Sequence, residues 1–535
     1  GSFAAQALET TSTGGLDNEG DGSVINVKTT GNLSVDKATG FRSVTLSTAG
    51  GSGAIDAGVL VGGSSGINLA TGSGLLTVDS ATGGGNVTLG TSGGDIIAGP
   101  LQSTSAVVTV DGAKVTLADV TSGTNIVLTA SGDLDAGNLL ATRDLTLTAG
   151  GKAVLVTAAA GDDIRAVAAS FAATTLETTG TGGLDSEGDG SVIKVTAGSG
   201  DLVLGSANGN RHLTLIAQSG KISANLLETN TGDVSVTANG SGAIAVVGVD
   251  AAGNVALAAK PGVSITSNSV VSRTASVSIT GGTLGLGEVS ADRNIALDAS
   301  TDILVTKLTA ARDLGIDAVG TVTVGEAAAG DDLVVNAGNS DLSALKTTST
   351  GGLDSEGDGS NVRVTTTGLL KAGSVAAHRS AVLTSQNGAI VAGAIATQTG
   401  GVTFTSATTI AYDTIDSNTA VALKSLGSAA IGGGKIQSQT STITVTGGGL
   451  TLGDLKAGTN IVLTGAGDVT AGALVGVRDT TVSSAGLVTL ASATAGDDLI
   501  INADTTMLGP LSATGTGGLD NEGDGSNIRI NTQGL

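Results

Sequence analysis

The feature that most constrains this chain is a long internal repeat. The segment GGLDNEGDGS at residues 14–23 returns at 182–191, 351–360 and 517–526, either identical or with one Ser in place of Asn. Its leucines, Leu16, Leu184, Leu353 and Leu519, mark a period of about 168 residues, and repetition along a whole chain is typical of stacked supersecondary units. We divide the chain into units 1–168, 169–337 and 338–503 and a partial fourth unit, 504–535.

A finer period lies inside each long unit. Short apolar runs begin at Val44, Val87, Ile126 and Leu145, with others between them, in steps of about 20 residues. Within a run, apolar residues alternate with Thr, Asn or Ser, as in a β-strand, and Gly, Ser, Asn and Asp separate the runs, as in turns. We therefore predict an all-β fold, a parallel β-helix (β-solenoid) with about 20 residues and three short strands per coil. The preference for right-handed crossovers predicts a right-handed helix.

The composition supports one long, narrow core. The chain has 87 Gly, one Tyr, four Phe and no Trp, yet 40% of its residues are hydrophobic. Ala, Val, Leu and Ile fill a slender column of stacked coils, whereas larger rings would overfill it, and Gly suits the tight corners. The alternative is an array of separate β-sandwiches, one per long unit. Sandwiches commonly bury a Trp or Tyr, and neither recurs here. We therefore treat residues 1–535 as a single continuous β-solenoid.

Charge and cysteine content limit the classes of function. The net charge of −23 opposes binding to nucleic acid, which requires clustered Lys and Arg. The chain contains no Cys, which excludes disulfides and thiolate metal sites. It also lacks a run of eighteen apolar residues, so we predict no membrane-spanning segment.

The coil sequences resemble those of a known family. RDLTLTAGGKAVLVTAAAGDDI (143–164), TNIVLTASGDLDAGNLLATRDL (124–145) and their later copies are similar to the coils of filamentous-haemagglutinin-type exoproteins, the two-partner-secreted adhesins of Gram-negative bacteria. The resemblance covers nearly the whole chain. It implies a secreted or cell-surface rod that acts in adhesion, aggregation or biofilm formation. The long repeat and the acidic segment depart from the family's pattern, and the family's N-terminal secretion domain is not visible.

Charged residues provide a check on coil stacking. Arg143 and Asp162 stand one coil apart in the sequence, and Arg312–Asp331 and Arg478–Asp497 repeat this offset. We predict that each pair forms a surface contact between neighbouring coils, worth ~0.2–1 kcal/mol. Asp144 and Asp163 would stack with like charge, at some cost.

The acidic segment has two interpretations. Asp17, Glu19, Asp21 and Gly22 match positions 1, 3, 5 and 6 of an EF-hand-type calcium loop. Position 12 lacks the expected bidentate carboxylate, because Lys28, Thr196, Thr365 and Asn531 occupy it in the four copies. The segment is therefore either a calcium site or a solvated acidic turn that projects from one coil per unit. The candidate calcium ligands are Asp17, Glu19, Asp21, Asp185, Glu187, Asp189, Asp354, Glu356, Asp358, Asp520, Glu522 and Asp524.

We expect no enzymatic activity. The two histidines, His212 and His378, lie beside arginines, and we interpret them as incidental surface residues. The pair Asp162–Asp163 recurs in each unit, as a structural feature would. We predict the shaft of a secreted or surface-anchored fibre that contacts a host cell, a neighbouring cell or copies of itself. The alternative is a calcium-stabilised subunit of an extracellular filament or surface array, which could associate laterally or end to end.

Overall fold

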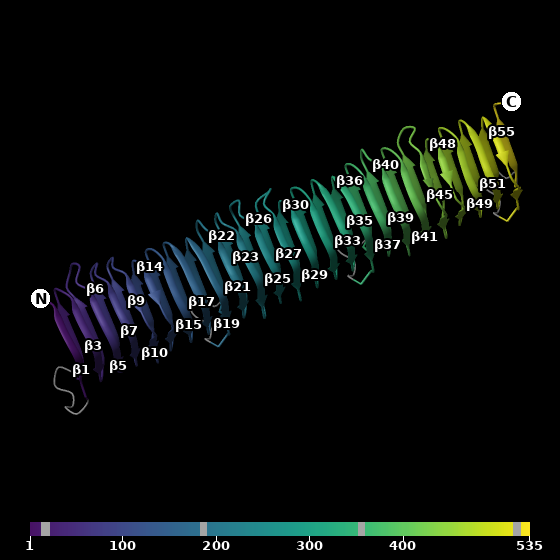
Figure 1. Cartoon of the computed structure of the whole chain (residues 1–535). Coiled ribbons are helices and arrows are strands. Elements are labelled where there is room, and N and C mark those ends of the chain that lie inside the picture. The colour runs from purple at the N-terminus through teal and green to yellow at the C-terminus, as the bar shows by residue number, and fades with distance from the viewer. Residues whose placement is uncertain (12–21, 182–189, 351–358, 517–525, 535) are drawn as a thin grey trace. The chain divides into compact units, whose positions relative to one another are not determined.

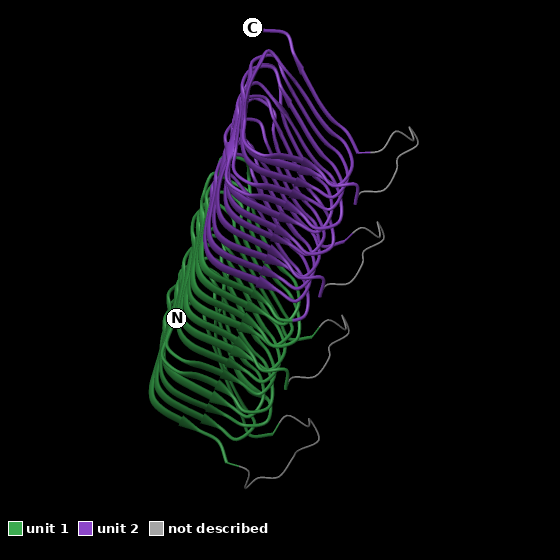
Figure 2. Cartoon of the chain, turned by 90° about the vertical axis from the view of Figure 1, so that its right-hand side faces the viewer, with its two compact units in different colours: residues 1–273 green, residues 274–535 purple. Residues whose placement is uncertain are grey.

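A computed structural model describes residues 1–11, 22–181, 190–350, 359–516 and 526–534. The chain divides into two compact units, Gly1–Arg273 and Thr274–Leu535 (Figure 2). We describe each unit by itself. All regular structure in the described residues is β-strand, without any helix, and the strands of each unit lie side by side (Figure 1).

Each turn of the chain has two parts, which we call the short arm and the long arm. In one turn of unit 1, β14 (Ile126–Ala130) is the short arm and β15 (Leu134–Ala141) is the long arm. The chain then enters the short arm of the next turn, β16 (Leu145–Ala149), which pairs with β14.

The short arms of unit 1 are β2 (Val24–Thr29), β4 (Ser43–Thr48), β6 (Gly66–Thr71), β8 (Val87–Thr91), β11 (Val108–Gly112), β14, β16, β18 (Ile164–Ala168), β20 (Val192–Ala197), β22 (His212–Ala217), β24 (Val234–Ala238) and β26 (Val255–Ala259). Its long arms are β1 (Phe3–Glu9), β3 (Leu33–Gly40), β5 (Ile55–Gly62), β7 (Leu76–Gly83), β9 (Ile96–Ala98) with β10 (Leu101–Ser103), β12 (Val115–Leu117) with β13 (Val120–Ser122), β15, β17 (Lys152–Ala160), β19 (Ser170–Thr178), β21 (Leu202–Gly209), β23 (Ile222–Thr229), β25 (Ile244–Ala251) and β27 (Ile265–Ser272).

The short arms of unit 2 are β28 (Val277–Gly281), β30 (Ile295–Ala299), β32 (Leu314–Ala318), β34 (Leu333–Ala337), β36 (Val362–Thr366), β38 (Ala381–Ser385), β40 (Val402–Ser406), β42 (Val421–Ser425), β45 (Ile443–Gly447), β48 (Ile461–Gly465), β50 (Thr480–Ser484), β52 (Leu499–Ala503) and β55 (Ile528–Thr532). Its long arms are β29 (Leu284–Ala291), β31 (Ile303–Ala310), β33 (Thr321–Ala329), β35 (Asn339–Thr347), β37 (Leu370–Ala377), β39 (Ile390–Thr397), β41 (Ile410–Ser417), β43 (Ile431–Gly433) with β44 (Ile436–Ser438), β46 (Leu450–Leu452) with β47 (Leu455–Ala457), β49 (Val469–Gly476), β51 (Leu487–Ala495) and β53 (Thr505–Leu508) with β54 (Leu511–Ala513).

Equivalent arms of successive turns pair in parallel. In the short arms, Ile126 lies opposite Leu145, and Leu145 lies opposite Ile164. In the long arms, Leu134 lies opposite Ala153. The same pairing continues through each unit, so each unit is a parallel β-solenoid, with about 25 turns in the two units together, spaced roughly 19 residues apart. The predicted all-β solenoid and its period are confirmed.

The burial pattern explains why a turn has three sides. In β15, Leu134 and Ala136 are buried, two consecutive residues then face outward, and Leu139 and Ala141 are buried again. A strand alternates strictly, so two outward residues in succession mark a bend. The long arm is therefore two short strands joined at a corner, and together with the short arm it gives the three strands per turn that the sequence predicts. Each inward position stacks on its equivalent in the next turn.

The few aromatic residues show how narrow the core is. Phe171 and Phe404 are the largest fully buried side chains. Tyr412 is 5% exposed, and its ring lies where a Cβ on Gly433 would stand, so a ring fits only because glycine follows it in the next turn. Its hydroxyl has no hydrogen-bond partner in the part of the chain that the structure describes. Burial raises the pKa of Tyr412 well above its usual value, so the phenol stays neutral.

Asp and Asn side chains link the turns at all three corners. Asp133 Oδ1 accepts a hydrogen bond from the backbone N–H of Lys152, in the next turn, at 2.8 Å. At the bend of the long arm, Asp119 Oδ1 accepts from the N–H of Asn138 at 2.9 Å. Such bonds satisfy N–H groups at corners, where strand pairing is interrupted. Part of the acidic composition is therefore structural.

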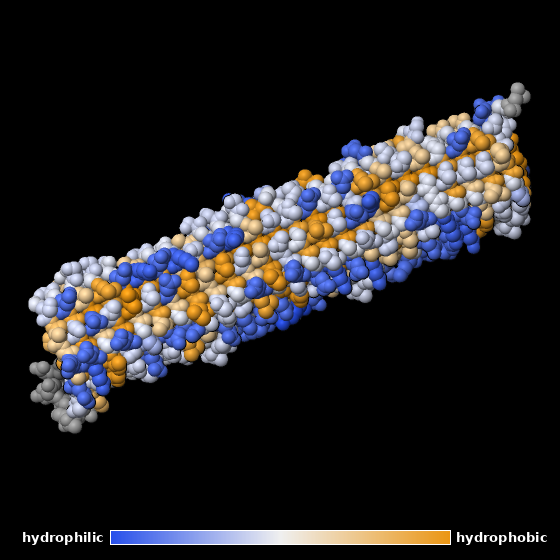
Figure 3. All heavy atoms as spheres, viewed as in Figure 1, coloured by the Kyte–Doolittle hydropathy of each residue, from blue (hydrophilic) through white to orange (hydrophobic). Residues whose placement is uncertain are grey.

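Outward positions also form columns. On the face drawn in Figure 3, apolar residues form bands that run from turn to turn, with polar residues between them. Leu140 in unit 1 and Leu304 in unit 2 are 54% and 60% exposed. Each unit thus presents a surface on which one side-chain position recurs at the strand spacing of about 4.8 Å.

Candidate functional site

The acidic segments interrupt the turns at one corner, where a long arm ends and the next short arm begins. The candidate calcium ligands all lie outside the described residues, so their prediction stays untested: Asp17, Glu19, Asp21, Asp185, Glu187, Asp189, Asp354, Glu356, Asp358, Asp520, Glu522 and Asp524. The structure does describe the residues at which each segment leaves and rejoins the solenoid. We call these residues the neck.

The second neck joins β19 to β20 in unit 1. Thr178, the last residue of β19, donates its hydroxyl hydrogen to the carbonyl oxygen of Ser191 at 3.1 Å. The same hydroxyl accepts from the backbone N–H of Asn210, in the following turn, at 2.9 Å. Thr178 is 2% exposed. One buried hydroxyl thus closes the base of the segment and ties it to the next turn.

The first and third necks repeat this geometry. Thr10 donates to the carbonyl of Ser23 at 2.9 Å, and Thr347 donates to that of Ser360 at 2.7 Å. The N–H groups of Phe41 and His378 donate to Thr10 and Thr347, each at 3.0 Å. The fourth neck has Ala513 at this position and therefore lacks the hydroxyl.

At the last three necks, aspartates from the preceding turn hold the exit, where the chain rejoins the solenoid. Asp162 Oδ1 accepts from the N–H of Ser191 at 2.5 Å, and Asp163 Oδ1 accepts from the N–H of Val192 at 2.8 Å. Asp162 is fully buried, and Asp163 also forms a salt bridge with Arg165 at 2.8 Å. Hydrogen bonds to an ionised carboxylate are about twice as strong as neutral ones.

The aspartate pair recurs in unit 2. Asp331 Oδ1 accepts from the N–H of Ser360 at 2.6 Å, and Asp332 Oδ1 accepts from that of Asn361 at 2.8 Å. At the fourth neck, Asp498 Oδ1 accepts from the N–H of Asn527 at 2.9 Å. The repeated GDD sequence is therefore an anchor for the acidic segment.

At three of the exits and three of the entries, the described backbone turns through the left-handed region. At the exits, Ser23, Ser191 and Ser360 have φ values of 67°, 63° and 67°. At the entries, Gly180, Ser349 and Gly515 have φ values of 71°, 60° and 70°. A left-handed residue other than Gly costs roughly 1 kcal/mol. Four serines bear this cost, three of them at the exits, so the chain direction at the exit is fixed by its surroundings.

The predicted Arg–Asp surface contacts are wrong in one respect. The pairs do stack, because the N–H of Asp162 donates to the carbonyl of Arg143 at 3.0 Å. Asp162, Asp331 and Asp497 are buried, however, with 0%, 0% and 4% exposure. The Asp162 side chain turns toward the neck, and Arg143 Nε has no hydrogen-bond partner among the described residues. Stabilising the neck outweighs pairing with the arginine.

The like-charged rung predicted for Asp144 and Asp163 is also relieved by the backbone. Asp144 Oδ1 accepts from the N–H of Asp163 at 3.5 Å. Asp163 in turn directs Oδ1 to Val192 and Oδ2 to Arg165. The two carboxylates are thus partnered by backbone and guanidinium groups.

The structure restricts how calcium could be held. Lys28, Thr196 and Thr365, at position 12 of the loop pattern, lie in short arms. Thr196 is paired with Val167 on one side and with Ile216 on the other. None of the three side chains at position 12 is a carboxylate that could bind calcium bidentately as in an EF-hand, so a calcium ion would need a different set of ligands. Across the described ranges, no group of three or more His, Cys, Asp and Glu side chains is placed to hold a metal.

The histidines occupy different positions in their turns. His212 begins β22, and its Nδ1 accepts from the N–H of Asp233 at 3.1 Å. His378 precedes β38, and its Nδ1 lies 2.9 Å from Gln398 Oε1. Both rings therefore link a turn to the next one.

Comparisons with protein-family models, curated proteins and solved structures gave no match to this chain. The β-solenoid is compatible with a β-helical adhesin. None of the described segments is a helix with the length and apolar character needed to cross a membrane.

Sequence reasoning missed the threonine of the neck and the burial of the aspartates. The signal was present in the repeat. LETT at 8–11 and 176–179 and LKTT at 345–348 precede the acidic segment, and GDD at 161–163, 330–332 and 496–498 stands one turn before its last three copies. Their role appears only when the turns are stacked, because the bonded residues are 13 and 29 positions apart.

Proposed function

We propose that this chain is the shaft of a large secreted or surface-anchored bacterial fibre that acts in adhesion, aggregation or biofilm formation. One observation carries the proposal: within each unit every turn pairs with the next over a continuous aliphatic core. In such a fold each additional turn lengthens the solenoid by about 4.8 Å. The resemblance to filamentous-haemagglutinin-type exoproteins supports the same conclusion.

The necks give the shaft a second property. In unit 1 the first and second necks precede β2 and β20, which are eight turns apart in the same column of residues. In unit 2 the third and fourth necks precede β36 and β55, again eight turns apart. A spacing of eight turns is about 38 Å. A fibre that presents nearly identical segments at a fixed spacing multiplies weak contacts by avidity.

The test is a shortened shaft. Deleting residues 24–191 removes one full repeat and joins Ser23 to Val192, so that the first segment re-enters the solenoid at β20. We expect the variant to retain its β-structure and lose eight turns, about 38 Å of length in small-angle scattering. Displayed on an otherwise non-adhesive bacterium, it should aggregate cells less than the full chain.

A matched control keeps the length and changes the surface. Thr45→Ser and Thr214→Ser alter two outward positions of β4 and β22 that lie eight turns apart. This variant should aggregate cells like the unchanged chain. If neither the full chain nor the shortened one changes aggregation relative to bare cells, the adhesive role is wrong, although the solenoid stands.

The alternative is a calcium-stabilised subunit of an extracellular filament or surface array. One observation favours calcium: the neck fixes both ends of the acidic segment, at Thr178 and Ser191. Fixed ends lower the conformational entropy that a loop would lose on closing around an ion. We expect calcium to slow hydrogen exchange in β20 and β22 beside the neck. Asp185→Asn with Asp189→Asn should abolish this effect, and equal protection in that variant would reject a site in the segment.

A further inference from the structure

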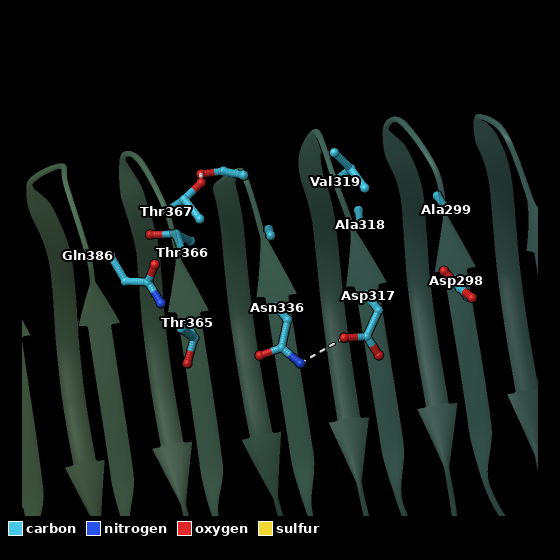
Figure 4. A pocket seen from close by; sticks show the side chains of 12 residues that line it. Asp298, Ala299, Asp317, Ala318, Val319, Asn336, Thr365, Thr366, Thr367 and Gln386 are labelled. Carbon is cyan, nitrogen blue, oxygen red and sulfur yellow. Dashed lines mark hydrogen bonds between the residues drawn. The ribbon is translucent and has the colours of Figure 1, made fainter. Parts of the chain in front are cut away.

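A groove lies on the outer face of unit 2, along the short arms β30, β32, β34 and β36. Its volume is about 570 Å³, and its lining combines carboxylate, amide and hydroxyl groups with small apolar side chains. Asp298, Asp317, Asn336 and Thr365 occupy one outward column, each in register with the next. Figure 4 shows Val319 and Thr367 above them, beyond the strand ends.

Two carboxylates dominate the charge of the groove. Asp298 and Asp317 are direct neighbours on adjacent strands, so their backbones are about 4.8 Å apart. Asn336 Nδ2 donates to Asp317 Oδ1 at 2.7 Å and orients that carboxylate, as the dashed line in Figure 4 shows. Like charges directly opposite each other destabilise a sheet. A cation shared by the two carboxylates would remove this cost.

The other repeats lack this pair. The residues at the same positions are Thr129 and Thr148 in the first repeat, and Thr464 and Ser483 in the third. Neutral hydroxyl residues therefore satisfy the requirements of the fold at these positions. The fold does not explain why the second repeat places two carboxylates there.

The apolar residues distinguish between kinds of cation. Calcium takes six to eight oxygen ligands, and the described residues group no three acidic or imidazole side chains around this point. Beside the carboxylates lie Ala318, which is partly exposed, and Val319, which is 76% exposed. An ammonium group on a hydrocarbon chain matches both parts, because its charge meets the carboxylates while its methylenes cover the apolar surface.

We propose that this groove binds an alkylammonium group, and that Asp298 and Asp317 hold its charge. Thr367 and Gln386, which also line the groove, add hydrogen-bonding groups for the rest of the ligand. The site goes beyond the shaft function proposed above, since it is specific to the second repeat. Two sources can supply the group: the lysine side chains of a partner protein or a free polyamine.

The test uses ligand-observed NMR with two probes, spermidine and an acetylated Gly-Lys-Gly-Lys-Gly peptide, at concentrations on the order of 1 mM. We expect saturation transfer from the full chain to the methylenes next to the nitrogen. Asp298→Thr with Asp317→Thr, which introduces the residue type of the first repeat, should weaken binding about five-fold. Binding of the peptide but not of spermidine identifies a protein partner, and the reverse identifies a free polyamine.

The control removes the same charge elsewhere. Glu288→Gln with Glu326→Gln changes two exposed positions on the long arms β29 and β33 of the same unit. This variant should bind both probes like the unchanged chain. Equal weakening in both double variants would show only attraction to an acidic surface and would overturn the proposal. So would displacement of the probes by an equal concentration of calcium, or the absence of saturation transfer from the full chain.

Discussion

At the corner before β18, Asp144 Oδ1 accepts the N–H of Asp163 at 3.5 Å, whereas at the neck before β20, Asp163 Oδ1 accepts the N–H of Val192 at 2.8 Å. Unit 2 shows the same contrast. At three of its corners where a long arm passes directly into the next short arm, Asp and Asn side chains reach the next turn at 3.4 to 3.5 Å, and at its necks the distance is 2.6 to 2.9 Å. We call a corner of this kind without an acidic segment an ordinary corner.

The difference follows from what each corner must do. At an ordinary corner the chain continues directly into the next strand, and the backbone pairing on both sides sets its position. At a neck the chain leaves the solenoid after Thr178 and returns only at Ser191, where the two residues bond. The register must then be re-established by side chains, because a slip of one residue would turn the inward residues of the short arm outward. The buried Asp162 adds a bond that ordinary corners lack.

The largest expected effect comes from removing that bond. Asp162→Ala leaves the N–H of Ser191 without its carboxylate, and we expect the local opening free energy of β20 to fall by about 3 kcal/mol. Hydrogen exchange of peptides from 192–197 measures it, since a solenoid opens locally.

The matched control is Asp144→Ala at the ordinary corner. The hydrogen bond from the N–H of Asp163 to Asp144 is long. We therefore expect the opening free energy of β18 to fall by less than about 1 kcal/mol. Equal losses in the two variants would contradict the view that necks are held more tightly than other corners.

The next effect tests the left-handed exit. Ser191→Val places a β-branched side chain at a φ of 63°, and such residues strongly disfavour this region. We expect the opening free energy of β20 to fall by about 2 kcal/mol. Ser43→Val, at the start of β4, is the control, because extended backbone accepts valine. Normal exchange in Ser191→Val would show that the exit is not constrained.

A smaller effect is expected from the threonine hydroxyl of the neck. Thr178→Val keeps the shape of the side chain but removes the hydroxyl that bonds Ser191 and Asn210. We expect the local opening free energy to fall by about 1.5 kcal/mol, which would be seen as faster hydrogen exchange in both β20 and β22. Faster exchange in β20 alone would show that the bond to Asn210 contributes nothing.

Much of the fold was predictable because stacking imposes one requirement many times. Inward positions such as Ile126, Leu145 and Ile164 must all be apolar, so the period of one turn recurs along the whole chain. The three strands per turn followed from the period of about 20 residues. The bend inside the long arm was less visible, because it is encoded only by two consecutive outward residues, such as Gly137 and Asn138.

The neck was less predictable for a physical reason. Its bonds join residues 13 and 29 positions apart and depend on which way a side chain turns at a corner. Periodicity placed Arg143 beneath Asp162 and suggested an ion pair. Periodicity could not show that the buried N–H of Ser191 has no strand partner. This N–H donates to the Asp162 carboxylate that the arginine was expected to pair with.

The smallest expected effect distinguishes the contribution of the left-handed backbone at Ser191 from that of its side chain. Ser191→Gly relieves the cost of a left-handed residue, roughly 1 kcal/mol, but glycine gains a similar conformational entropy in the opened chain. The two terms nearly cancel, so we expect the opening free energy of β20, measured by hydrogen exchange, to change by less than about 0.5 kcal/mol. A gain well above this would mean that Ser191 is a strained residue kept for the acidic segment. A clear loss would mean that its side chain, and not only its backbone, holds the neck that distinguishes this corner from the others.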